Sequence, residues 1–210
     1  MDSVLFHPER EPRLPGQRQF HPVATHAHSH HRRSELVLTA RLFGPPSCAR
    51  SPSTLCVFAE QTPDRNETVF TSFDPIRGKG RELARFTTDP NSDYSDWALS
   101  PDGTRIGFTK HGGNQVYLLP LDGSSVRNLT VLGWSGFRTF DWSFDSNGFF
   151  IDSVSGLGST LLFVDLSGKP HSLLQQKSSR GTWGVPSPDG RHLAVLGGEF
   201  SGNMWMIENF

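Results

Sequence analysis

Short runs of alternating hydrophobic and polar residues, separated by turn-forming residues, fill the chain from about residue 54 onward. In residues 97–108, WALSPDGTRIGF, the apolar Ile106 and Phe108 alternate with other residues directly after the tetrapeptide SPDG. Alternation of this kind predicts a strand with one buried face, and Pro, Asp and Gly in succession predict a tight turn. The stretch is therefore expected to form a β-hairpin.

The hairpin pattern recurs further along the chain, at residues 142–153 (WSFDSNGFFIDS) and 184–195 (GVPSPDGRHLAV). Aligning the turn glycines Gly103, Gly148 and Gly190 gives a period of roughly 42–45 residues, which is within the range of propeller blades. One strand position of this alignment is then occupied by three apolar residues, Ile106, Ile151 and Leu193. An internal repeat of this length favours similar sheets stacked around an axis over a single sandwich.

Each period has room for four short strands, which we expect in the best-formed unit at 94–99, 104–110, 115–121 and 126–132. Four antiparallel strands per unit, repeated radially, form the blades of a β-propeller. The fold class predicted is all-β: an incomplete propeller of about three to four blades over residues 53–210, with a degenerate first blade. An incomplete ring leaves unpaired strand edges at both ends, and such edges favour self-association.

These repeats resemble a known family. The SPDG turns, each followed by a strand, and a further strand ending at Asp122 and Gly123 resemble the WD-like repeats of TolB-type propellers. The closing run 182–210 is similar to the end of bacterial sensor propellers, which follow a protein-kinase or a winged-helix domain. The resemblance covers residues 54–210 and implies a ligand or partner bound by the propeller loops. The family often places its propeller in the periplasm, whereas no apolar run here predicts a signal peptide or a membrane span.

The net charge and the number of cysteines argue against some binding partners and against a disulfide-stabilised fold. The net charge is −1, so the chain has no overall field that would attract nucleic acid or an anionic membrane. Only two cysteines are present, Cys48 and Cys56, with seven residues between them. Neither a disulfide framework nor a zinc knuckle follows from this number and spacing, and free thiols are expected.

Residues 1–52 differ from the rest of the chain, because they are rich in Pro, Arg and His and show no sustained alternation. Such a segment buries too little apolar surface to offset the entropy of ordering, so we expect it to be disordered. A wrongly assigned start of the reading frame is the alternative. Four of its histidines offer imidazole ligands for Zn²⁺ or Ni²⁺, namely His26, His28, His30 and His31. A tail with adventitious metal affinity is the interpretation favoured, and no metal site is assigned.

Residues 1–210 show no pattern typical of catalysis or cofactor binding. The nucleophile elbow G-x-S-x-G and the glycine-rich phosphate loops are absent. The repeated carboxylates Asp102, Asp145 and Asp189 are interpreted as turn formers. The residues assigned a role are accordingly structural turn residues: Pro101, Asp102, Gly103, Gly148, Pro188, Asp189 and Gly190. The aromatic residues Trp97, Trp142 and Trp183 are expected to pack between blades rather than to form a ligand cage.

The function that follows from these observations is that of a non-catalytic binding or sensing module, without a cofactor, whose loops bind a protein or a small molecule. One alternative is the gating propeller of a prolyl-oligopeptidase-like peptidase, separated from its catalytic domain. Another is a truncated remnant without a function of its own. The purified chain is expected to show no hydrolase or phosphotransferase turnover, because its sequence has neither a nucleophile–base pair nor a phosphate loop.

Overall fold

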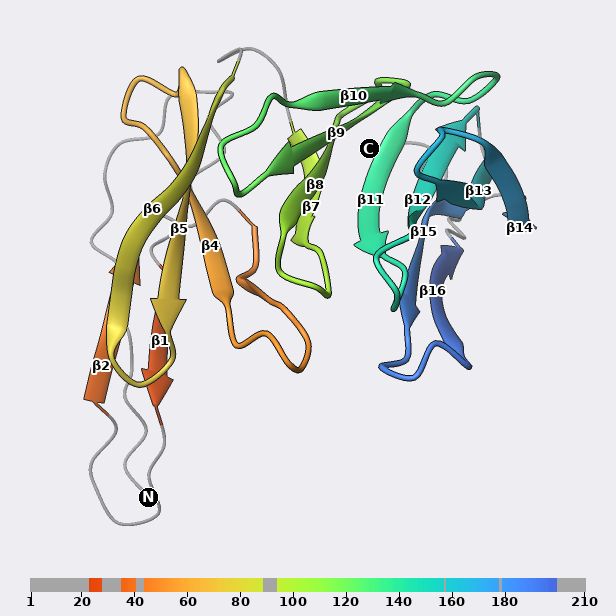
Figure 1. Ribbon diagram of the computed structural model, residues 1–210. Coiled ribbons are helices and arrows are strands. Elements are labelled where there is room, and N and C mark those ends of the chain that lie inside the picture. The colour runs from red at the N-terminus through yellow and green to blue at the C-terminus, as the bar shows by residue number, and fades with distance from the viewer. Residues whose placement is uncertain are drawn as a thin grey trace, which may run out of the picture.

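The computed structural model describes residues 23–27, 35–40, 44–88, 94–156, 158–177 and 179–199. All regular structure within these residues is β-strand, arranged in three four-stranded and two two-stranded antiparallel sheets. Figure 1 shows the sheets following one another along the chain, from the orange strands to the blue ones. The prediction of an all-β, incomplete propeller is confirmed. Among the described residues, no helix has the length and apolar character needed to cross a membrane.

Each complete blade is a meander in which consecutive strands pair. Blade 1 consists of β3 (Ser47–Cys48), β4 (Cys56–Gln61), β5 (Glu67–Asp74) and β6 (Gly78–Thr87). Blade 2 consists of β7 (Tyr94–Leu99), β8 (Arg105–Lys110), β9 (Gln115–Pro120) and β10 (Arg127–Thr130). Blade 3 consists of β11 (Phe137–Trp142), β12 (Gly148–Ser155), β13 (Gly158–Asp165) and β14 (Pro170–Gln176). The described part of blade 4 is the hairpin of β15 (Ser179–Pro186) and β16 (Leu193–Glu199).

The first blade begins before the boundary expected at residue 53. Of the segment 1–52, the structure describes a hairpin of β1 (Val23–Ala27) and β2 (Glu35–Ala40), and residues 44–52. Ser47 and Cys48 pair with β4 as the first strand of blade 1. The histidines 28, 30 and 31 lie outside the described residues, so the metal interpretation stays a prediction.

Cys48 and Cys56 are joined by a disulfide bond, so the expectation of free thiols is wrong. The two residues are direct partners in the β3–β4 ladder, with their Cα atoms 4.0 Å apart. Sequence spacing did not reveal this pairing, because it depends on the register of a strand within a segment that was expected to be disordered.

The turn glycines of the repeat are not all equivalent. Gly103 and Gly190 have positive φ angles of 73° and 68°. In the turn of blade 3 the residue with the positive φ, 59°, is Ser146. Each of the three donates its N–H to the carbonyl of the serine three positions earlier. Gly148 lies two residues further on and opens β12, so its assignment as a turn residue is wrong. Counted from Gly103 to Ser146 and on to Gly190, the period is 43 and then 44 residues.

In blade 3 the strand after the turn is displaced from the aligned position by the same two residues. In each turn the backbone amide of the first serine donates to the carbonyl of the residue five positions later. The residue after that acceptor is Ile106 in blade 2, Phe149 in blade 3 and Leu193 in blade 4. Phe149 therefore occupies the position that the alignment gave to Ile151. Both residues are completely buried and face the same side of β12, which is why the hydrophobic pattern did not distinguish the two registers.

Two hydrophobic cores fill the spaces between neighbouring blades. The first, between blades 1 and 2, contains Val57, Ala59, Phe70, Trp97, Leu99, Ile106, Phe108 and Leu119. The second, between blades 2 and 3, contains Val116, Leu118, Leu129, Val131, Phe137, Phe140, Trp142, Phe149, Ile151, Leu162 and Val164. Successive residues of a strand point to opposite faces, so β9 supplies Leu118 to the second core and Leu119 to the first. Blade 2 is thus buried on both faces.

Of the three tryptophans expected between blades, two are found there. Trp97 is 4% exposed and Trp142 is 1% exposed. Trp183 is 40% exposed and lies opposite Leu196, which is 70% exposed, on the β15–β16 hairpin. The described residues do not cover this apolar face, and self-association through the open side of the ring stays a prediction.

Replacing Gly103 with valine is expected to lower the free energy of unfolding by roughly 1–3 kcal/mol, the usual cost of a strained backbone conformation. Besides the positive φ, a Cβ at this position would lie 2.6 Å from Ser53 Oγ. Gly123→Val is the matched control, because Gly123 has a φ of +86° and no atom within 4 Å of an added Cβ. Urea unfolding of both variants separates strain from contact. If Gly103→Val is as stable as the wild type, the turn geometry is wrong.

Candidate functional site

The repeated carboxylates serve the turns in which they stand. Asp189 Oδ1 accepts hydrogen bonds from the Ser187 hydroxyl (2.6 Å) and the Arg191 amide (3.1 Å). These two bonds hold the pKa of Asp189 below its usual value. Asp102 and Asp145 accept the equivalent bonds in their own blades. These hydrogen bonds give the three carboxylates a structural role in their turns.

Pro101 and Pro188 occupy equivalent positions but different surroundings. Pro101 is buried and its carbonyl accepts a hydrogen bond from the backbone amide of Arg50, at 2.7 Å. Pro188 is exposed. The turn of blade 2 therefore helps to fasten the first blade to the second, whereas the turn of blade 4 is on the surface.

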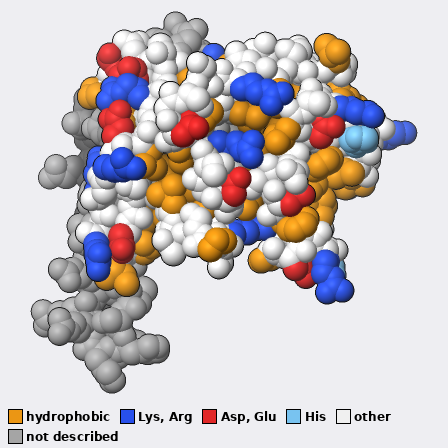
Figure 2. Space-filling view, in the orientation of Figure 1, with side chains coloured by type: hydrophobic (Ala, Val, Ile, Leu, Met, Phe, Trp, Pro, Cys, Tyr) orange, Lys and Arg blue, Asp and Glu red, His pale blue; other side chains and the backbone are white. Residues whose placement is uncertain are grey.

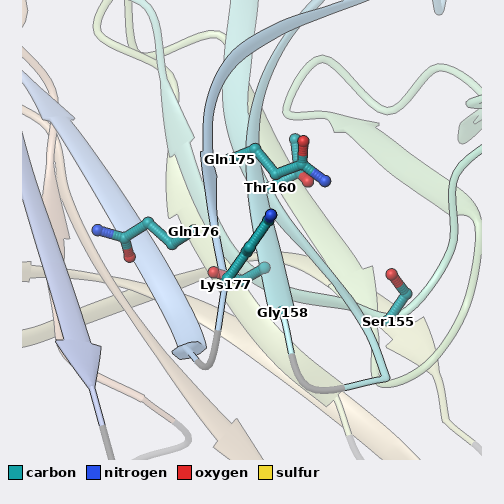
Figure 3. Close-up of a pocket in the computed structure, with 7 residues that line it drawn as sticks. Ser155, Gly158, Thr160, Gln175, Gln176 and Lys177 are labelled. Atoms are coloured by element: carbon teal, nitrogen blue, oxygen red, sulfur yellow. The ribbon is translucent and has the colours of Figure 1, made fainter.

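A polar pocket lies where the hairpins of blade 3 end (Figure 3). It has a volume of about 280 Å³ and is lined by Ser155, Gly158, Ser159, Thr160, Gln175, Gln176 and Lys177. Its side chains are hydroxyls, amides and one ammonium group. In Figure 3, Lys177 extends toward Thr160 and Gln175, whereas Gln176 points the other way. The pocket thus offers several neutral hydrogen-bonding groups and one positive charge.

Behind the pocket, between blade 3 and β15, lies a cluster of oxygen-bearing side chains: the buried Asp152, Ser159 and Thr182, and the half-buried Gln176. Asp152, Ser159 and Thr182 are 0%, 2% and 1% exposed. The Ser159 and Thr182 hydroxyl oxygens are 2.6 Å apart, and the Thr182 hydroxyl donates to Gln176 Oε1 at 3.1 Å. We call these four residues the oxygen cluster. It connects to the pocket through Ser159 and Gln176, which belong to both.

Asp152 is the unusual member of the oxygen cluster. Neither of its carboxylate oxygens has a hydrogen-bond partner of normal geometry. Burial raises the pKa of Asp152 to about 6, although the Thr182 amide, the charge of Arg138 and the Ser159 hydroxyl each lower it in part. An ionised carboxylate in such a place is costly unless a donor or a cation reaches it.

A second group of charges lies at the inner edges of the blades, where β7, β11 and β15 adjoin. The Arg50 guanidinium of blade 1 donates to the carbonyls of Pro186 and Ser187 in blade 4, at 3.3 and 3.4 Å. Asp96 on β7 accepts from the Trp97 amide (2.9 Å) and, on the neighbouring blade, from the Phe140 amide (3.1 Å). These contacts connect blade 1 with blade 4 and blade 2 with blade 3.

Asp96 and Asp141 are partly buried at these inner edges. Burial and, to a smaller extent, the charge of Asp141 raise the pKa of Asp96 to about 6, against the two amides that lower it. Burial likewise raises the pKa of Asp141 to about 6, although the Trp142 amide and the Arg50 charge lower it in part. Both carboxyls are thus weaker acids than solvated ones. No group of three or more His, Cys, Asp or Glu side chains suited to a metal occurs among the described residues.

Sequence analysis assigned none of the pocket or cluster residues. The one available signal was Asp152 itself, a carboxylate in the apolar strand sequence FFIDSVS. A buried carboxylate within such a strand indicates either a partner or a function. Its surroundings were not predictable, because Thr182 comes from another blade.

The comparisons with known proteins bear on the fold. No sequence-family profile and no curated protein sequence matches the chain. Among solved structures, TolB from Acinetobacter baumannii is similar over 81% of this chain and 42% of its own, with a TM-score of 0.58 and 20% identity. A putative TolB from Agrobacterium tumefaciens matches 80% of this chain and 62% of its own, with a TM-score of 0.56 and 19% identity.

Hydrazine synthase from Kuenenia stuttgartiensis is similar over 78% of this chain and 46% of its own, with a TM-score of 0.56 and 16% identity. The chain thus spans about half the length of the solved structures that it resembles. A structural likeness at these identities concerns the fold, because one fold carries many functions. The described residues have the fold of a TolB-like β-propeller, of which they form part of the ring.

Proposed function

We propose that this chain is a non-catalytic binding module that holds a small polyhydroxylated anion in the polar pocket of blade 3. The observation that carries the proposal is the composition of the pocket: hydroxyls and amides around the single ammonium group of Lys177. Neutral amides and hydroxyls suit the hydroxyl groups of a ligand, and a lysine suits its carboxylate. The pocket also lies at strand ends, where propeller loops are placed to bind ligands.

The contacts of the Ser159 hydroxyl favour binding over catalysis. A catalytic serine needs a base that is hydrogen-bonded to it. The Ser159 hydroxyl lies against the Thr182 hydroxyl, at 2.6 Å, and the nearby Asp152 carboxylate makes no hydrogen bond of normal geometry with it. The repeated turn carboxylates, for their part, are held by their own turns. These contacts support binding without turnover.

Adding D-gluconate is expected to raise the Tm of the wild-type chain by about 2–4 °C, because a ligand that binds only the folded state stabilises it. D-Glucose, which has similar hydroxyls but no charge, is expected to have a smaller effect. Lys177→Met should remove the difference between the two. Lys169→Met is the matched control, since Lys169 lies at the other end of the β13–β14 hairpin.

Three results would contradict the proposed function: no shift with gluconate, an equal shift in both lysine variants, or turnover of an ester or lactone substrate that is lost on Ser159→Ala. Thermal scans at several ligand concentrations and a chromogenic ester assay give these readouts. The second result would indicate binding elsewhere on the surface. On the face drawn in Figure 2, basic and acidic side chains are interspersed, so no broad surface of one sign competes for the anion there.

We further propose that the module is the ligand-binding part of a larger bacterial signalling protein. The resemblance of the repeats in residues 54–210 to those of sensor propellers supports this. Translation of the neighbouring DNA in all frames tests it. Kinase or winged-helix motifs in continuity with this chain are expected, whereas a G-x-S-x-G motif there would favour the gating propeller of a peptidase.

A further inference from the structure

We propose that the oxygen cluster is a binding site for a hard metal cation, with Ca²⁺ as the best fit, between blade 3 and β15. The site would differ from the anion pocket, with which it shares Ser159 and Gln176: it needs Asp152 and Thr182, which do not line the pocket, and it does not need Lys177. It goes beyond the proposed function, because a buried cation would act on how blade 4 attaches to blade 3.

The cluster supplies the ligand atoms that such a cation prefers. Calcium binds oxygen atoms of carboxylates, amides and hydroxyls at about 2.3–2.6 Å, often with a carboxylate in bidentate mode. Asp152 offers two oxygens, and Ser159, Thr182 and Gln176 offer one each. The oxygens of Ser159 and Thr182 are 2.6 Å apart, and those of Thr182 and Gln176 are 3.1 Å apart. Neighbouring ligands of one ion with bonds of about this length have separations of this order.

The Thr182 amide and the Ser159 hydroxyl lie near the carboxylate and lower its pKa in part, but neither makes a hydrogen bond of normal geometry with it. The Thr182 hydroxyl gives its hydrogen to Gln176 Oε1, and the Ser159 and Thr182 hydroxyls share the contact at 2.6 Å. Asp152 is completely buried and both its oxygens lack a partner. A native structure rarely leaves a buried carboxylate in this condition. A cation inserted between Asp152 and the three neutral oxygens would satisfy it.

The backbone of β15 passes directly over the carboxylate. A Cβ added to Gly181 would lie 3.4 Å from Asp152 Oδ2. Three residues further along, a Cβ on Gly184 would lie 3.0 Å from the Leu161 side chain, so β15 also packs closely against blade 3 there. The candidate ligands come from β12, β13, β14 and β15. A cation bound to them would therefore brace blade 4 against blade 3.

One carboxylate and the nearby charge of Arg138 argue for moderate affinity, in the range of about 10⁻⁴–10⁻³ M known for weak calcium modules. The test is thermal unfolding of the whole chain after EGTA treatment, with roughly 5 mM CaCl₂ added back. We expect the Tm to rise by about 2–5 °C. Equal ionic strength from NaCl should give a smaller rise. Isothermal titration with CaCl₂ should give one site.

Asp152→Asn is the decisive variant, because it removes a buried charge at constant volume and should therefore fold. It is expected to lose the calcium response, while retaining the gluconate response that Lys177 supports. Asp165→Asn is the matched control, since Asp165 lies in the exposed β13–β14 turn. Thr182→Val gives a second test from the other blade.

Two results would overturn the cation site. One is a calcium response of the same size in Asp152→Asn, which would mean adventitious binding, for example at the N-terminal histidines. The other is no calcium response in the wild type. A failure of gluconate to bind would leave both measurements unaffected.

Discussion

Replacing Trp142 with alanine is expected to lower the free energy of unfolding by about 3–5 kcal/mol, the usual cost of emptying a buried aromatic site. Trp142 is 1% exposed and lies in the core between blades 2 and 3. Its ring packs edge-on against Phe140 and Phe149, with centroids 5.6 and 6.0 Å apart. The space cannot close easily, because these rings are themselves held between two sheets.

The indole also makes a hydrogen bond that alanine cannot replace. Its Nε1–H donates to the carbonyl of Ala98 on the neighbouring blade, at 3.0 Å. The substitution therefore removes a donor from a partly buried carbonyl in addition to creating a cavity. A typical domain has a free energy of unfolding of about 5–15 kcal/mol, and a loss of this size is a large share of it. We therefore expect the variant to be largely unfolded at 37 °C.

Trp183→Ala is the matched control, because Trp183 occupies an open face and is 40% exposed. Its expected cost is under about 1 kcal/mol, as for substitutions at the surface. Urea unfolding followed by far-UV circular dichroism compares the two variants. Equal costs would mean that an undescribed part of the chain or a second copy covers Trp183, and light scattering would then show which.

The fold was predictable because the propeller repeat is a local pattern. Each blade is a meander of neighbouring strands, so the alternation of residues such as Ile106 and Phe108 with the SPDG turns carries most of the information. The register of the third blade was not predictable in the same way. Asn147-Gly148 resembles the Asp-Gly pair that ends an SPDG turn, so the sequence suggests Gly148 as the turn residue. Only the backbone shows that Ser146 has the positive φ.

The candidate site was far less accessible from the sequence, because its contacts are not local. The Ser159–Thr182 contact joins strands of different blades, and Arg50 reaches carbonyls 136 and 137 residues away. Neither contact involves a recognisable spacing. The disulfide between Cys48 and Cys56 was missed for a related reason, since it depends on the pairing of a two-residue strand.

The free energy of unfolding is expected to increase as the pH falls from 7 to 5. Asp96, Asp141 and Asp152 each have a pKa of about 6 in the folded chain, raised by burial from an ordinary value of 3.8. Between these two values the folded state binds a proton that the unfolded state does not, so acidification stabilises the fold. With a pKa shift of about two units, each group contributes about 1 kcal/mol over this pH range.

Protonation of the turn carboxylates lowers the free energy of unfolding instead of raising it, but only at lower pH. Hydrogen bonds lower the pKa of Asp145 and Asp189, so the stability that they provide is complete above the unfolded pKa of 3.8. It is lost only as the pH falls through their folded values, which lie below 3.8. Stability is therefore expected to reach its maximum between about pH 4 and pH 5 and to decrease on either side.

Urea unfolding at pH 7, 6 and 5, in the presence of EGTA, measures this dependence without a cation at Asp152. Asp141→Asn should reduce the increase by at least the share of one carboxyl, because it also removes the charge that raises the pKa of Asp96. Arg50 remains in place in this variant, so the contact between blades 1 and 4 is preserved. Asp189→Asn, which changes an exposed turn carboxylate, should keep the wild-type slope. If Asp141→Asn also shows the wild-type dependence of the free energy of unfolding on pH, then water reaches the inner edges of the blades and the carboxyls there titrate as solvated ones.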